Sequence, residues 1–278
     1  RMLHQDSENL LYQIEDQTIP SPVTRMAVLL EISALKVIWE KKTYLLFLIG
    51  LLSLLTFVAI PSHLINLSLY IGLLSPGNFF SFILLPLVTL ILGISAIVDE
   101  KESRTISHLF ARPIGRHELI FSKWIVANIM GFIITTAVNV LVFFAVAGFA
   151  NDFSLALNNL DLLLSSSIFL GIYVVTYTSI FLFVGTIIEK NALVLGLIIA
   201  YFEVFFSQFI FGLGMGSAGS PYSITNHLYN LASEFLMPDY LSYSIINFEP
   251  VGSILVIAGL ILLSFIGAMV VIRMKDLP

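Results

Sequence analysis

The stretch IVANIMGFIITTAVNVLVFFAVAGFA, residues 125–150, contains no charged side chain. A transmembrane α-helix needs about 20 consecutive, mostly apolar residues, and this run is longer than that. The run is continuously apolar, whereas a strand of a membrane β-barrel alternates apolar and polar residues. It therefore predicts one helix that crosses a bilayer.

Similar apolar runs lie on both sides of this stretch. The whole chain is 58% hydrophobic and only 11% charged, whereas a soluble domain has about 25% charged residues. We therefore predict an all-α membrane protein with six transmembrane helices. The predicted spans are Tyr44–Ile60, Phe79–Val98, Ile125–Ala150, Leu162–Ile188, Ala192–Gly212 and Pro250–Ile272.

The positive charges fall on one side of this six-span arrangement. All 13 lysines and arginines lie in the segments 1–43, 99–124, 189–191 and 273–278, and none lies in 61–78, 151–161 or 213–249. The positive-inside rule places the first group in the cytoplasm. We predict a multi-pass protein of the plasma (inner) membrane with both termini in the cytoplasm.

The chain divides into two regions. Residues 1–43 are polar or mixed, so we expect no cleavable signal peptide there. They form a cytoplasmic arm that leads into a helix over Arg25–Lys42, and residues 44–278 form the six-helix transmembrane domain. The helix either lies in the membrane interface or is an ordinary extension of the first span.

The loop over residues 99–124 reads DEKESRTISHLFARPIGRHELIFSKW. Ile106, Leu109 and Phe110 recur at helical spacing, and Pro113 must end the helix that they form. A short helix with exposed apolar residues suits docking into a groove of another protein. Alternatively, these residues pack against the ends of the protein's own spans.

The stretch 213–249 is the longest segment that we place outside the cytoplasm. It begins with a glycine-rich turn, and we expect a helix over Asn226–Met237 that ends at Pro238. Residues 64–74 form a second outer apolar segment, which is too short to span a bilayer.

Polar side chains inside the spans mark a second candidate site. Glu203 lies near the middle of the fifth span, and Gln208 follows in the same span. A charge at this depth is costly, so Glu203 must face a cavity, a partner or other helices. It is either a substrate-path or proton-linked residue, or a carboxyl group that holds helices together. We expect Asn128 and Asn139 to form hydrogen bonds between helices.

Several kinds of chemistry lack a motif in this sequence. It contains no P-loop motif, no His/Cys cluster with metal-ligand spacing and no cysteine. We therefore expect no catalytic site, no metal and no cofactor in this chain.

The loop over residues 99–124 resembles the corresponding segment of ABC-2 type transporter permeases. Those chains have an acidic E-x-E-S-x-T-I/L segment after the second span, followed by L-L-S-R-P-I-S-R and a lysine that opens the third span. Phe110, Ala111 and Gly115 depart from this pattern without removing the helix, the proline or the basic pair. The matching residues are Glu100, Glu102, Ser103, Thr105, Ile106, Leu109, Arg112, Pro113, Ile114, Arg116 and Lys123.

The resemblance implies an ATP-driven transporter, and by family an exporter. Two permease chains, identical or different, would form the pathway, and two separate P-loop ATPase subunits would bind ATP and Mg. The loop would be the coupling helix that docks into an ATPase, and no nucleic acid is expected as a partner. The implied coupling residues are Glu100, Glu102, Arg104, Thr105, His108, Leu109, Arg112, Pro113 and Arg116.

Two other functions stay open at this level. The first alternative is an ion-coupled secondary transporter with Glu203 as its proton site. The second is a membrane assembly subunit that does not transport. The spans show no inverted repeat of the kind many secondary transporters have. The sequence is compatible with a lipid, a hydrophobic drug, a peptide or an ion as substrate.

Overall fold

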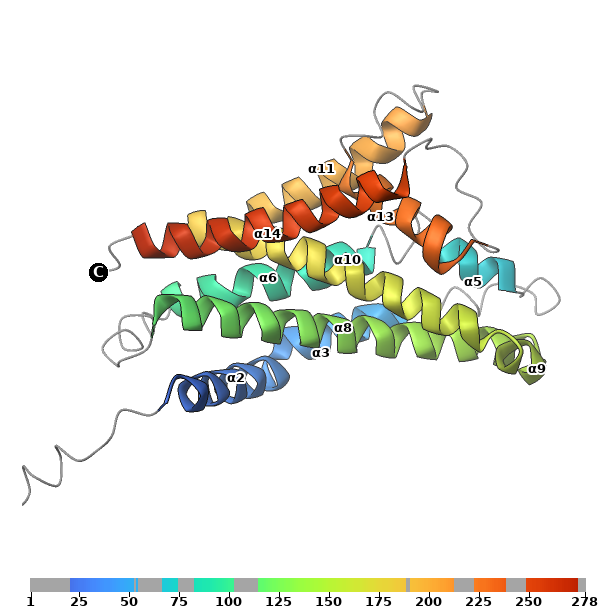
Figure 1. The fold of residues 1–278 in the computed structure, drawn as a ribbon. Helices are drawn as coiled ribbons and strands as arrows, with labels where there is room; N and C mark the ends of the chain where they lie inside the picture. The colour runs from blue at the N-terminus through green and yellow to red at the C-terminus, as the bar shows by residue number, and fades with distance from the viewer. Residues whose placement is uncertain are drawn as a thin grey trace, which may run out of the picture.

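A computed structural model of the chain describes residues 21–52, 54, 67–74, 83–102, 115–188, 191–212, 223–238 and 249–274. All regular elements in these ranges are helices, which confirms the predicted helical class. Figure 1 shows the long helices lying alongside one another, with short helices gathered at one end.

Three helices are long and apolar enough to cross a membrane: α8 (Arg116–Phe149), α10 (Leu160–Ile187) and α14 (Pro250–Met274). At about 1.5 Å per residue the shortest, α14, is about 38 Å long, which exceeds a hydrocarbon core of about 30 Å. These helices coincide with the third, fourth and sixth predicted spans.

The other three predicted spans correspond to α3 (Lys41–Leu52), α6 (Leu85–Glu102) and α11 (Ala192–Gly212). The described apolar parts of α6 and α11 are Leu85–Asp99 and Ala192–Glu203, which are shorter. Residues 55–60 and 79–82 of the predicted spans lie outside the described residues. The six-span topology therefore stays a prediction.

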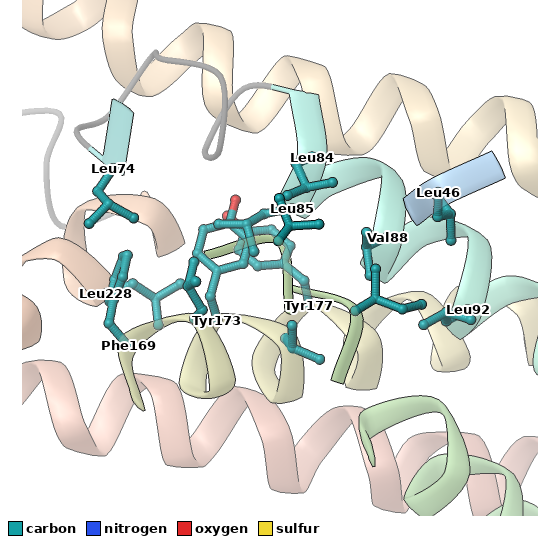
Figure 2. Close-up of a cluster of buried hydrophobic side chains, with 14 of the residues drawn as sticks. Leu46, Leu74, Leu84, Leu85, Val88, Leu92, Phe169, Tyr173, Tyr177 and Leu228 are labelled. Atoms are coloured by element: carbon teal, nitrogen blue, oxygen red, sulfur yellow. The ribbon is translucent and has the colours of Figure 1, made fainter. Parts of the chain in front are cut away.

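Helix α10 is the centre of the bundle. It packs against α6, α8 and α14, and its apolar residues are far more buried than those of α14. Figure 2 shows side chains of α6 and α10 meeting in the core. The arrangement leaves most of α14 to face lipid or another chain.

An aromatic column runs along the buried face of α10. Phe169, Tyr173, Tyr177 and Phe181 follow one another at every fourth position, which places them on one helix face. Tyr173 and Tyr177 stack with their ring centroids 4.5 Å apart. All four side chains are at most 3% exposed.

Two glycines let α6 and α10 approach closely. A Cβ atom on Gly93 of α6 would lie 2.8 Å from the Phe181 Cβ, and one on Gly185 of α10 would lie 3.3 Å from the Ile94 Cα. Small residues at such positions allow the close packing on which helix association in lipid depends.

The predicted N-terminal helix is present as α2 (Pro22–Trp39). Ser21 caps its start, and Glu40 is extended, so the helix ends before Lys42. Val28, Ile32, Leu35 and Trp39 are exposed along one side, whereas Leu29 is only 4% exposed and α2 packs on α8. The sector that contains Arg25 and Leu29 therefore faces the protein.

Three short helical segments lie at the opposite end: α5 (Leu67–Leu74), α9 (Phe153–Leu157) and α13 (Ile224–Leu231) (Figure 1). After α13 the chain forms one π-helical segment, η4 (Ala232–Leu236), before Pro238. The helix predicted over Asn226–Met237 thus begins two residues earlier and changes its hydrogen-bond register midway.

Candidate functional site

Charged side chains gather where α6 and α14 end and α8 begins, and we call this region the basic end. It contains Arg25, Lys42, Arg116, Lys123 and Arg273, which belong to these helices near those ends or to segments that contact them. The opposite, distal end contains α5, α9 and α13. The predicted coupling loop leaves and re-enters the bundle at the basic end.

Glu118 lies in the first turn of α8 and links two parts of the chain. Its Oε2 accepts a hydrogen bond from the Gly115 backbone N–H at 3.1 Å, which satisfies an amide at the helix start. Its Oε1 accepts one from the Arg25 Nη2 of α2 at 3.3 Å. The start of α8 is therefore tied to α2 by a carboxylate that is mostly buried.

Arg116 connects the re-entry point of the loop to the last helix. Its Nη1 donates to the backbone carbonyls of Ile272 and Arg273, both at 3.2 Å. These carbonyls belong to the last turns of α14, where a positive charge is favourable. Arg116 is the predicted coupling residue whose side chain the structure describes, and it contacts α14.

Lys42 and Asp99 join α3 to the last part of α6. The Lys42 Nζ lies 2.9 and 2.8 Å from the two carboxylate oxygens of Asp99, and 3.3 Å from the Ser95 hydroxyl. Asp99 precedes the point where α6 leads into the loop. Three separate contacts thus hold α2, α3 and α14 to the two ends of the loop.

The loop itself lies largely outside the described residues. Glu100 and Glu102 belong to the end of α6, but the structure does not describe their side chains. The other predicted coupling residues, Arg104, Thr105, His108, Leu109, Arg112 and Pro113, lie outside the described residues. Since α6 packs against α8, the loop leaves and returns to adjacent helices.

The ion pairs at the basic end were not predicted from the sequence. Arg25 and Glu118 are 93 residues apart, and Lys42 and Asp99 are 57 apart. Glu118 did carry a local signal, because an acidic residue three positions after a cap residue is typical of a helix start. Nothing local indicates its partner on α2.

Glu203, the candidate substrate-path residue, accepts four hydrogen bonds. Oε1 accepts from the Ser223 hydroxyl at 2.8 Å and the Thr225 backbone N–H at 3.0 Å. Oε2 accepts from the Thr225 hydroxyl at 2.7 Å and from the Tyr177 hydroxyl. The donors come from α10 and the start of α13, so the carboxylate joins three helices.

The position of this carboxylate matches the charge distribution of α13. Ser223 is the N-cap residue of α13, and Thr225 provides one of the first backbone amides of the helix. Negative charge is favourable at a helix N-terminus. The arrangement supports the interpretation that Glu203 holds helices together. Gln208 lies on α11, and its side chain is outside the described residues.

Helix α13 makes further polar contacts with its neighbours. His227 and Asn230 both contact the Ser253 hydroxyl of α14, at 3.0 and 2.9 Å. The Tyr229 hydroxyl donates to the Leu74 carbonyl at the end of α5. Hydrogen bonds thus fix α13 to α5, α10, α11 and α14.

Asn139 forms the second polar network of the distal end. Its Nδ2 donates to Ser166 and Ser167 of α10 at 2.9 and 3.2 Å, and its Oδ1 accepts from the Tyr70 hydroxyl of α5 at 2.8 Å. Burial raises the pKa of Tyr70 above its ordinary value, so this hydroxyl stays neutral. The predicted interhelical role of Asn139 is confirmed.

The same prediction is wrong for Asn128. Its Nδ2 donates to the Trp124 carbonyl at 2.8 Å, within its own helix. An asparagine amide can donate to a carbonyl on the preceding turn of its own helix, and the sequence does not distinguish this arrangement from a bond between helices.

Within the described ranges, no three acidic, histidine or cysteine residues group closely enough to hold a metal ion.

A sequence model of the family described as ABC-2 family transporter protein matches residues 5–272 of the chain. No curated protein sequence matches the chain significantly.

Proposed function

Because the chain belongs to the ABC-2 transporter family, we propose that it is the membrane-spanning permease subunit of an ATP-driven exporter. ATP hydrolysis takes place in separate P-loop ATPase subunits, two per complex, which bind ATP and Mg. A second permease chain, identical or different, completes the membrane pathway. The loop over residues 99–124 docks into the ATPase.

The observation that carries this proposal is the way the two ends of the loop are held. Asp99 contacts α3, Glu118 contacts α2, and Arg116 contacts the end of α14. A force on the loop therefore reaches three other helices directly. Such contacts suit a segment that transmits ATPase closure to the membrane helices.

The distribution of charge supports the proposed orientation. Arg25, Lys42, Arg116, Lys123 and Arg273 belong to the basic end, and α2 lies at the same end of the bundle (Figure 1). The positive-inside rule assigns such an end to the cytoplasm. We therefore place the basic end and both termini in the cytoplasm of a six-span protein in the plasma membrane.

Purification of the tagged chain from its native host in mild detergent tests the proposal. We expect a stoichiometric P-loop ATPase to copurify with it. Charge reversal by Glu102→Arg or Arg112→Glu should uncouple ATP hydrolysis from transport while the chain stays folded. Glu234→Arg is the matched control, because Glu234 is exposed on η4 at the distal end and should leave coupling unchanged.

The results separate this proposal from its alternatives. A folded chain without an ATPase partner would favour an ion-coupled carrier, in which Glu203→Gln should abolish transport. The four hydrogen bonds that Glu203 accepts argue against that role, because they leave little capacity for an exchangeable ligand. An ATPase partner without any transport would identify a membrane assembly subunit.

A further inference from the structure

A narrow recess lies where α2 turns into α3. It is enclosed by α2, α3, α6 and α8, and we call it the elbow recess. Three of its lining residues are lysines, Lys36, Lys42 and Lys123, and Glu40 and Ser95 also line it. The permease function proposed above uses Lys42 for its contact with Asp99 but gives no role to Lys36 or to the recess itself.

The exposed side chains around the recess place it at the surface of the membrane. On α2, Val28, Ile32, Leu35 and Trp39 recur at intervals of three or four residues and are exposed, Trp39 at 74%. Such a stripe on a helix before a span is typical of a helix that lies in the interfacial plane. Leu45 and Leu48 continue the exposed apolar surface along α3.

The charges of the recess favour an anion. Its three lysines are opposed by Glu40 and by Asp99, which Lys42 already contacts at 2.8 Å. The formal balance is therefore one net positive charge. Lys36 is exposed and can reach a ligand from the rim, whereas the Lys42 Nζ, although its side chain is 43% exposed, already donates to Asp99 and Ser95 and adds mainly positive potential.

The size of the recess defines how an anion can sit. Its interior offers about 20 Å³, and one water molecule needs about 10–15 Å³ by this measure. A whole lipid headgroup cannot enter. A phosphate must therefore stay outside the interior, at the rim where Lys36 is exposed, while Lys123 also lines the recess.

We propose that the elbow recess binds the phosphate of an anionic phospholipid in the leaflet at the basic end. The acyl chains of that lipid lie along the exposed apolar side chains of α2 and α3. Lysines near a membrane surface attract acidic lipids, and the interfacial position limits the choice of ligand to molecules that reside there.

Trp39 provides a direct readout of this lipid. The chain has two tryptophans, so a Trp124→Phe background leaves Trp39 as the fluorophore beside the recess. The protein is placed in phosphatidylcholine nanodiscs that contain a small fraction of either brominated phosphatidylglycerol or brominated phosphatidylcholine. Bromine quenches tryptophan at short range, so quenching reports local enrichment of each lipid.

We expect brominated phosphatidylglycerol to quench Trp39 more strongly than brominated phosphatidylcholine at equal mole fraction. Lys36→Gln with Lys42→Gln should remove this preference, at about fivefold in enrichment per lysine. Lys41→Gln is the matched control, because Lys41 is exposed next to Lys42 but does not line the recess. The control should keep the preference.

Three outcomes would overturn the proposal. Equal quenching by the two lipids would exclude a site for anionic lipid. Equal loss in the Lys41→Gln control and the double variant would indicate diffuse attraction to the membrane surface. Equal quenching by the two lipids, together with binding of inorganic phosphate that the double variant loses, would show that the lysines bind free phosphate rather than a lipid. Thermal unfolding of each variant confirms that the fold is intact.

Discussion

The basic end and the distal end of the bundle hold their polar side chains in different ways. At the basic end, ion pairs join helices across partly exposed contacts, with side-chain exposures of 21% for Arg25 and 43% for Lys42. At the distal end, Asn139 and Thr225 are 0% exposed and form networks of hydrogen bonds.

This difference indicates which end of the molecule can rearrange cheaply. An ion pair as exposed as that of Lys42 and Asp99 contributes about 0–1 kcal/mol, and water replaces its contacts when it breaks. Buried networks are costly to break, because each group that loses its partner cannot reach water. We infer that the distal end moves as one block, whereas the basic end adjusts to forces on the loop over residues 99–124.

The largest effect is expected at Glu203, whose loss would disrupt the distal block. Glu203→Ala leaves the Thr225 backbone N–H without its acceptor and weakens the contact with Tyr177. We expect a loss of about 3 kcal/mol in the free energy of unfolding. Thermal unfolding in nanodiscs measures the stability, and hydrogen exchange at the Thr225 amide measures the local opening.

Two controls bracket this result. Glu203→Gln keeps one acceptor oxygen, so its effect should be intermediate. Glu234→Ala removes an exposed acid of the same end and should have almost no effect. If Glu203→Ala unfolds at the temperature of the parent chain, Glu203 does not anchor α13, and the substrate-path interpretation regains support.

The sequence identified Glu203 but not its partners. A carboxylate inside an apolar span must find partners, and this requirement can be read from hydropathy alone. Three of the four hydrogen bonds come from Ser223 and Thr225 and the fourth comes from Tyr177 of α10, whereas the sequence predicted only a helix over Asn226–Met237 in the first of these segments. Helix α13 docks against α11 through tertiary packing, which no local pattern records.

The next effect is expected at Asn139, which joins α8 to α5 and α10. Asn139→Ala removes three hydrogen bonds between helices, and we expect a loss of about 1–2 kcal/mol. Asn128→Ala is a matched control in the same helix, because Asn128 bonds only to its own helix among the described residues. Thermal unfolding of both variants gives the comparison.

Equal destabilisation by the two substitutions would contradict the interpretation. It would mean that the loss of any asparagine from α8 is costly, whatever its partners. The sequence cannot separate these two residues, because both lie in the same apolar run and their helix faces differ only in what packs against them.

The ends of helices show a similar limit of sequence reading. Hydropathy placed the start of the third span at Ile125, whereas α8 begins at Arg116. The hydropathy of a segment reports where a membrane would surround it, but Glu118 caps the helix before that point. The connection between α6 and α8 is therefore shorter than the predicted loop over residues 99–124.

A smaller effect is expected for the ion pair of Lys42 and Asp99 at the basic end. A double-mutant cycle with Lys42→Gln and Asp99→Asn should give a coupling of about 0.2–1 kcal/mol, because both side chains are partly exposed. High salt should reduce this coupling, whereas the effects of Glu203→Ala and Asn139→Ala should not change with salt. A coupling as large as the effect at Glu203 would remove the contrast between the ends.

The smallest effect is expected at Asp152, and it tests whether the contrast between the two ends is caused by exposure or by position in the bundle. Asp152 lies at the distal end but is exposed, and its carboxylate caps α9. The hydrogen bond from the Ser154 hydroxyl, at 2.6 Å, lowers the pKa of Asp152 below its ordinary 3.8. Because the pKa of Asp152 is lower in the folded chain than in the unfolded chain, its charged form stabilises α9 at any pH above the unfolded pKa. This stabilisation is lost as the pH falls through the pKa of the folded chain.

We therefore expect Ser154→Ala to raise the pKa of Asp152 toward 3.8, with almost no change in global unfolding at neutral pH. The carboxyl carbon shift of Asp152 in an acid titration measures the pKa. If Ser154→Ala destabilised the whole chain as much as Asn139→Ala does, an exposed distal contact would be as strong as a buried one. The contrast between the two ends would then depend on their position in the bundle, and burial would not explain it.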